Sequence, residues 1–239
     1  MELTKHGHAC VALSDGDRRI VIDPGAFTDP AAFAGAGAVL ITHEHPDHFE
    51  PERLRAALDA DRALEVWTTT PVAARLEGLG TRVHVVGHGD AVTVAGFDVR
   101  VHGELHAEIH PEIPRIANIG FLVDGGAHGA VFHPGDALTV PDEPVATLLV
   151  PLHAPWSRTA DVIDYVRAVH ADQVFAVHDG LLNDTGLGVV GGLLGSEGQG
   201  PPRPTAGWPR GTRPSSEARP RPPGADQRTA RLDRPAMPA

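Results

Sequence analysis

The sequence predicts an α+β fold in which two stacked β-sheets are covered by helices. Short runs rich in Val and Ile recur along residues 1–195, and they fall into two groups with helical patterns between them. Each run is bounded by Gly, Asp or Pro. The expected strands are Ala9–Leu13, Arg19–Asp23, Ala38–Ile41, Glu65–Thr68, Arg82–Val86, Ala91–Val94, Phe97–His102, Ile119–Val123, Ala130–His133, Thr147–Val150 and Val174–Val177.

Three segments between the strands have helical patterns. Pro51–Leu58 begins with proline, which suits the first helical turn, and its apolar residues fall on one face. Pro71–Leu79 repeats this pattern after Thr70, a residue type suited to the N-cap. Thr159–Val169 also carries its apolar residues at helical spacing. These helices supply the outer layers of the predicted fold.

The charge changes sign near residue 195. Residues 1–195 hold 12 basic and 27 acidic residues, a balance of −15, whereas residues 196–239 hold 8 Arg against 4 acids, a balance of +4. The second segment also holds 10 of the 22 prolines. We therefore expect a folded domain over 1–195 and a disordered Pro/Arg-rich tail over 196–239. The alternatives are a basic recognition arm and an out-of-frame end of a GC-rich coding sequence.

Composition disfavours several classes of protein. No stretch approaches the roughly 20 consecutive apolar residues of a membrane span, and residues 1–10 lack the apolar run of a signal peptide. The single cysteine, Cys10, excludes an internal disulfide and fits a reducing compartment. We therefore expect a cytoplasmic protein without membrane partners. The net charge of −11 disfavours nucleic-acid binding, because attraction to phosphate dominates that affinity.

The strongest chemical signal is Thr42-His43-Glu44-His45-Pro46-Asp47-His48, which directly follows an expected strand. His43 and His45, two residues apart, can share one metal if the backbone is extended. Asp47 and His48 lie on the next turn and can reach a second metal. Imidazole and carboxylate suit zinc and are tolerated by manganese or iron. Four ligand-type residues in six positions disfavour the alternative, a polar helix-capping loop.

This H-x-H-x-D-H motif resembles the metallo-β-lactamase superfamily. Gly7-His8-Ala9 and Ile22-Asp23-Pro24 are similar to the branch that includes L-ascorbate-6-phosphate lactonase, and further candidate ligands follow later strands. The resemblance covers essentially all of residues 1–190 and none of the tail. It implies a four-layer αββα metallo-β-lactamase sandwich.

The resemblance also implies a ligand set for two divalent ions, with Zn²⁺ expected first and Mn²⁺ or Fe²⁺ as alternatives. The first ion would take His43, His45 and His106, the second would take Asp47, His48 and His178, and Asp136 would bridge both. His102 and His110 compete with His106. His102 lies within a strand pattern and His110 precedes a proline, so His106 is preferred and His110 is the fallback.

Other polar residues near strand ends receive lesser roles. His153 follows an apolar strand and is a candidate proton donor or substrate contact, with an ordinary loop histidine as the alternative. His8 suits a structural hydrogen bond. His133 is expected to line the metal cleft, and Asp23 is expected to orient a metal-bound histidine.

Two adjacent cations can lower the pKa of a bridging water and supply hydroxide, which Asp136 would orient. We therefore expect a metal-dependent hydrolase of a small molecule, such as a lactone or another cyclic ester or amide, with catalytic roles for Asp136, Asp47 and His153. The alternatives are a phosphodiesterase or nuclease, which the acidic body disfavours, a glutathione-thioester hydrolase, and a metal-binding protein without turnover. A homo-oligomer also stays open.

Overall fold

The computed structural model describes residues 1–194, which form two six-stranded sheets. The first sheet has the strands in chain order: β1 (Glu2–Lys5), β2 (Val11–Asp15), β3 (Arg18–Ile22), β4 (Ala38–Leu40), β5 (Glu65–Thr68) and β6 (Val83–Val85). The second sheet runs in the reverse order from β12 to β7: β12 (Gln173–Val177), β11 (Thr147–Pro151), β10 (Val131–His133), β9 (Gly120–Val123), β8 (Phe97–His102) and β7 (Ala91–Val94).

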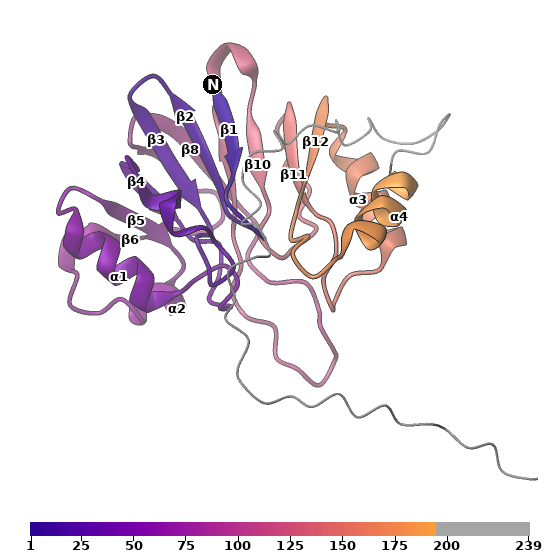
Figure 1. Cartoon of the computed structure of the whole chain (residues 1–239), viewed down its shortest axis with the longest axis horizontal. Coiled ribbons are helices and arrows are strands. Elements are labelled where there is room, and N and C mark those ends of the chain that lie inside the picture. Colours follow the sequence, from indigo (N-terminus) through magenta and orange to yellow (C-terminus); the bar gives the residue numbers. More distant parts are fainter. Residues whose placement is uncertain (195–239) are drawn as a thin grey trace, which may run out of the picture.

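Helices cover the outer face of each sheet, as Figure 1 shows. On one side lie α1 (Pro51–Ala60) and α2 (Thr70–Ala74), and on the other lie α3 (Thr159–Val169) and α4 (Asp184–Leu194). Short 3-10 turns occupy Pro30–Phe33, Gly80–Arg82 and Gly126–His128. The order helix, sheet, sheet, helix confirms the predicted four-layer sandwich.

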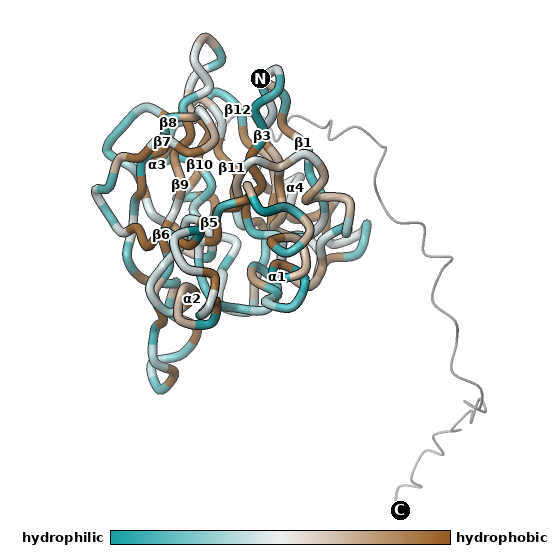
Figure 2. Tube along the Cα trace, turned by 90° about the vertical axis from the view of Figure 1, so that its left-hand side faces the viewer, coloured by the Kyte–Doolittle hydropathy of each residue, from teal (hydrophilic) through white to brown (hydrophobic). Residues whose placement is uncertain are grey.

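The core has three parts because strand side chains alternate between faces. In β3, Ile20 and Ile22 pack between the sheets against residues such as Phe121, whereas Val21 packs toward Leu54 and the helices of the first layer. A third cluster joins the second sheet to α3 and α4. In Figure 2 the hydrophobic stretches follow the strands and the hydrophilic ones concentrate in the connecting loops. Burial of apolar area in three layers therefore fixes how the strands stack.

Three elements differ from the sequence prediction. Strand β1 was not predicted, because Glu2–Lys5 reads ELTK and has little strand character, yet it pairs along β2. Helix α4 was not predicted, because Asp184–Leu194 is rich in glycine, which disfavours helices. Its apolar residues pack on the second sheet and offset that propensity.

Helix α2 is shorter than the predicted Pro71–Leu79 and ends at Ala74. Turns follow it, and Gly78 and Gly80 both adopt positive φ angles that a continuing helix does not allow. Thr70 is the first helical residue rather than the N-cap, a position that Thr69 occupies. The other strand boundaries shift by at most two residues.

Within residues 1–194, the helices are all too short to cross a membrane. The predicted tail at 196–239 lies outside the described residues. The domain boundary at residue 195 and the cytoplasmic location therefore stay predictions.

Candidate metal centre

The candidate ligands lie where four strands end. Strands β8 and β10 are each antiparallel to β9 and so run the same way, and β11 and β12 are parallel to β10. The loops that carry His106, Asp136 and His178 therefore leave the second sheet at one edge. The H-x-H-x-D-H loop leaves β4 of the first sheet. The fold thus brings together residues that are up to 135 positions apart.

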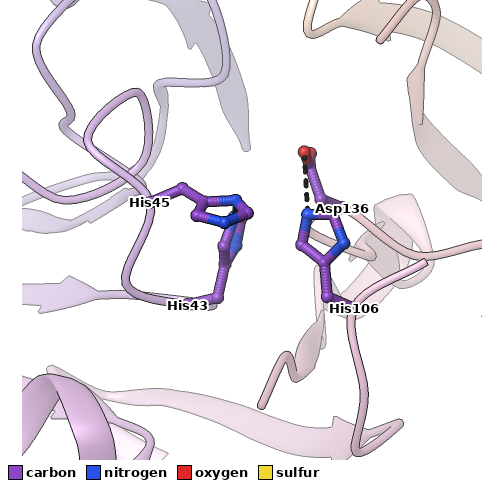
Figure 3. A group of neighbouring side chains, drawn as sticks. All are labelled: His43, His45, His106 and Asp136. Carbon is purple, nitrogen blue, oxygen red and sulfur yellow. Dashed lines mark hydrogen bonds and ion pairs between the residues drawn. The ribbon is translucent and has the colours of Figure 1, made fainter. Parts of the chain in front are cut away.

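One group of candidate ligands consists of His43, His45, His106 and Asp136, whose donor atoms lie within 4.8 Å of one another. Nε2 of His43 is 3.2 Å from Nδ1 of His45, and Nε2 of His106 is 3.4 Å from Oδ2 of Asp136. Figure 3 shows the two histidines of the first sheet facing His106 and Asp136. Three imidazoles and a carboxylate match the donor set that zinc takes.

A second group of candidate ligands shares Asp136 with the first. Asp136 offers Oδ1 at 3.1 Å from Nε2 of His48 and Oδ2 at 3.1 Å from Nε2 of His178. Asp47 lies beside them, with Oδ2 at 3.2 Å from Nε2 of His178 and 3.9 Å from Nε2 of His48. All seven predicted ligands are therefore gathered around one carboxylate. The fallback ligand, His110, instead lies in an exposed loop, where its Nδ1 accepts from the amide of Glu112.

Main-chain carbonyls hold the rings of two candidate ligands, His106 and His178, on the side away from the site. Nδ1 of His106 is 2.6 Å from the carbonyl oxygen of Ala107, and Nδ1 of His178 is 2.8 Å from that of His153. A carbonyl only accepts, so in both rings Nδ1 carries the proton. Their Nε2 atoms therefore face the centre of the site and are the ones available to an ion.

Asp23 holds the rings of two more histidines. It contacts His48 directly and His43 through the hydroxyl of Thr42. Its Oδ2 is 2.7 Å from Nδ1 of His48 and also accepts from the hydroxyl of Thr42 at 2.7 Å. Since that hydroxyl donates to Asp23, it accepts from Nδ1 of His43 at 2.9 Å. Asp23 is fully buried and orients candidate ligands through hydrogen bonds, as predicted.

The unsatisfied atoms of the site fit a cation. Buried polar atoms almost always have a hydrogen-bond partner. Among residues 1–194, Nε2 of His48, His106 and His178 and Oδ1 of Asp136 are buried and find no hydrogen-bond partner. Four inward-facing nitrogen and oxygen atoms without a hydrogen bond from the described residues are the arrangement that divalent ions satisfy.

The ionisable groups of the site shift one another's pKa values toward the charged forms. Burial opposes ionisation of Asp136, but His48, His106 and His178 outweigh it and hold the pKa of the carboxyl well below its usual range. Burial likewise opposes protonation of His178, yet contacts with Asp136 and Asp47 raise its pKa to about 9. The site thus attracts positive charge, which a proton supplies when no metal does.

Two glycines allow the loops to approach this closely. Gly135 has a φ of +64°, and a Cβ there would lie 2.4 Å from Oδ1 of Asn118. That same oxygen accepts from the amide of Asp136 at 2.9 Å, which fixes the backbone of the shared ligand. A Cβ on Gly25 would lie 2.1 Å from the backbone of Asp47. Any larger residue at either position would push a ligand-bearing loop away.

Trp156 contacts the site and was not identified from the sequence. It is half-buried and its Nε1 donates to Oδ2 of Asp136 at 3.0 Å. The available signal was its position three residues after His153, in a loop that follows β11. His153 itself is half-buried, and its carbonyl supports His178. A proton-donor role for the side chain of His153 stays a prediction.

The expectation that His133 lines the cleft is wrong. Its ring is fully buried, with Nε2 at 3.0 Å from the carbonyl oxygen of Ala9 and Nδ1 accepting from the amide of Gly135 at 3.1 Å. Both nitrogens are therefore used by the main chain. His133 fixes the turn that leads to Asp136 instead.

A four-layer αββα fold with a cluster of histidines and aspartates at the edge of its sheets is typical of one class of metal-binding sandwich proteins. The model of the beta-lactamase superfamily domain matches residues 2–178, and the chain belongs to that family. Protein Rv0786c of Mycobacterium tuberculosis is 40% identical over 196 residues, which cover 81% of this chain and 91% of that protein. A UPF0173 metal-dependent hydrolase of Natranaerobius thermophilus is 34% identical over 142 residues, 57% of this chain and 60% of that protein.

Solved structures show the same fold. A protein of Parabacteroides distasonis named as a metal-dependent hydrolase gives a TM-score of 0.64 at 21% identity and covers 84% of this chain and 92% of its own. An isothiocyanate hydrolase from Delia radicum gut bacteria gives 0.54 at 16% identity, with 81% and 92% covered. The comparisons confirm the predicted metallo-β-lactamase fold and the predicted enzyme class, a metal-dependent hydrolase.

Proposed function

We propose that this hydrolase holds two divalent ions and uses them to cleave a small-molecule substrate. The observation that carries the proposal is the sharing of Asp136 between two groups of buried donor atoms. His43, His45 and His106 would hold the first ion, and Asp47, His48 and His178 the second. We propose Zn²⁺ as the ion, since imidazole and carboxylate donors suit it, with Mn²⁺ or Fe²⁺ as alternatives.

The chain's own residues divide the work of hydrolysis. Two ions bound here would supply an acidified water and polarise the oxygen of the attacked bond. Asp136 lies between both donor groups and can orient the nucleophile, because its two oxygens face different histidines. Asp47 would complete the second group, and His153 is the candidate to protonate the leaving group. No serine or cysteine nucleophile is required.

Lactones and other cyclic esters or amides are the proposed substrates. The resemblance of the motif set to L-ascorbate-6-phosphate lactonase supports this choice. The balance of −15 over residues 1–195 also supports it, because an acidic surface repels phosphodiesters such as nucleic acid. The small-molecule substrate, rather than a macromolecule, is thus the expected partner.

A matched substrate panel tests the proposal. Protein loaded with zinc or manganese is assayed on simple γ- and δ-lactones and on bis-p-nitrophenyl phosphate, each with and without chelator. We expect chelator-sensitive lactone hydrolysis. Phosphodiester cleavage alone would instead identify a phosphodiesterase. Metal binding without turnover of any substrate would contradict the proposed lactone hydrolysis.

Asp136→Ala provides the matched variant for the same panel. Loss of the shared carboxylate is expected to remove most lactone turnover and to lower metal content. Elemental analysis of the same samples reports the metal. Full activity in Asp136→Ala would contradict the central role of this residue.

A further inference from the structure

His8 stands next to the second donor group without being one of the predicted ligands. It is 3% exposed, and its ring lies 3.9 Å from that of His178, centroid to centroid. Its carbonyl oxygen also accepts from the amide of His178 at 2.8 Å. Donor atoms of His8, Asp47 and His178 lie within 4.8 Å of one another. By position alone, His8 is either a further ligand or a support for one.

The hydrogen bond on Nδ1 decides between these roles. The amide of Gly180 donates to Nδ1 of His8 at 2.9 Å. An N–H group only donates, so Nδ1 must carry a lone pair, and the ring proton sits on Nε2. His106 and His178 show the opposite arrangement, with carbonyl acceptors behind Nδ1. The Nε2 of His8 therefore has a proton where a ligand needs a lone pair.

That proton points to a use in the site. Nε2 of His8 is buried, forms no other hydrogen bond within residues 1–194, and lies 3.3 Å from Oδ2 of Asp47. The ring has little freedom to turn away. Phe27 packs edge-on against it with centroids 5.6 Å apart, and a Cβ on Gly180 would lie 2.9 Å from its Nδ1. An unsatisfied buried donor thus stands fixed beside an ionised carboxylate.

We propose that His8 is a positioning residue for the second ion: its Nε2–H donates to Asp47 and holds that carboxylate in the ligating position, and His8 itself binds no metal. The inference rests on the two-metal site proposed above. Hydrogen-bond partners of metal ligands fix ligand orientation, and their loss typically weakens metal binding about 10–100-fold. His8 would thereby couple the Gly180 turn, through its ring, to the H-x-H-x-D-H loop.

Two conservative substitutions separate this role from its rivals. His8→Gln places an amide N–H near the position of Nε2 and keeps the donor to Asp47. His8→Asn places an acceptor near the position of Nδ1 and keeps only the bond from Gly180. We expect His8→Asn to bind the second ion about 10–100-fold more weakly, and His8→Gln to stay close to the unaltered protein. Binding is measured by titrating metal-free protein with Co²⁺ and following its visible absorption.

Each other outcome overturns the proposal in a distinct way. A purely structural anchor for the Gly180 turn would reverse the order, with His8→Asn binding better than His8→Gln. A metal-ligating His8 would make both variants lose the second ion equally. Retention of both ions by His8→Asn would overturn the inference and leave the two-metal site intact. Binding of fewer than two ions by the unaltered protein would overturn the site and the inference together.

His88→Asn is the matched control. The Nδ1 of His88 also accepts from a glycine amide, that of Gly103 at 3.2 Å, but His88 belongs to neither donor group. Unchanged Co²⁺ binding in this variant would show that the loss in His8→Asn comes from Asp47 rather than from a general loss of a histidine. Thermal melts of the three variants identify any that fails to fold.

Discussion

Trp156 donates its indole N–H to Oδ2 of Asp136 at 3.0 Å, so a residue of the β11 loop fixes the carboxylate shared by both donor groups. Oδ2 also lies 3.1 Å from Nε2 of His178 and 3.4 Å from Nε2 of His106. A carboxylate oxygen has only two lone pairs, and the indole takes one of them. The plane of Asp136 is therefore restricted before any ion binds.

Trp156→Phe removes this donor and keeps most of the aromatic ring that packs against His106 at 5.9 Å. A hydrogen bond to a charged group contributes about 1.5–3 kcal/mol, so we expect turnover on the best lactone to fall about 10–100-fold. Steady-state kinetics on metal-loaded protein measure the change. Trp67→Phe is the control, because Trp67 stacks on His84 in the first sheet. An unchanged rate in Trp156→Phe would show that the indole does not position Asp136.

His106 and His110 form a matched pair for the ligand assignment. His106 is buried with its Nε2 3.4 Å from Oδ2 of Asp136, whereas His110 is exposed. We expect His106→Ala to lose the first ion and most activity, and His110→Ala to keep two ions per chain. Elemental analysis measures both variants. The reverse result would move the ligand to His110 and leave the fold unchanged.

Much of the candidate site could be predicted from the sequence, because its candidate ligands lie in loops that follow strands. The strands before His43, Asp136 and His178 are short apolar runs, and the edge at which they meet follows from the sheet order. The contact of Trp156 with Asp136 could not be predicted, since it depends on how a loop 20 residues away folds back. The role of His133 could not be predicted either. Its two nitrogens form hydrogen bonds with the backbone of Ala9 and Gly135, and only the fold brings Ala9 close to this ring.

The same limit applies to two elements that the sequence does not predict, β1 and α4. Strand β1 and helix α4 have weak local patterns, and both form because a sheet offers them a surface. Leu3 of β1 pairs with Leu13 across the first sheet, and Leu194 of α4 is buried on the second. Packing outweighs propensity in both elements, and packing is a property of the folded chain.

The pH dependence of stability should change sign when metal binds. In the metal-free protein, contacts with Asp136 raise the pKa of His178 to about 9 and that of His48 well above its usual value. The folded state then holds these protons above pH 6.5 and the unfolded state does not. This stability is fully present below pH 6.5 and is lost as pH rises toward 9, by on the order of 2 kcal/mol.

Chemical denaturation of chelator-treated protein at pH 6.5 and 8.5 measures this loss. His178→Gln should flatten the slope, since it removes one of the two responsible groups. With zinc bound, stability should instead rise over the same interval, because protons compete with the metal for the same nitrogens. Metal-free protein that becomes more stable toward pH 8.5 would contradict the protonation of His178.

His153 can act through its side chain or only through its backbone. Its carbonyl oxygen accepts from Nδ1 of His178, and a substitution to alanine keeps that carbonyl. If the imidazole protonates the leaving group, His153→Ala should lower turnover about 10²–10⁴-fold while two ions stay bound. If the backbone alone matters, rate and metal content should both stay near those of the unaltered protein. The rate and the metal must be measured on the same sample, because a lost ion and a lost proton donor both lower turnover.

A lactone with a p-nitrophenolate-like leaving group adds the decisive comparison. Such a group departs without protonation, so His153→Ala should recover most of its rate on that substrate only if the imidazole is the acid.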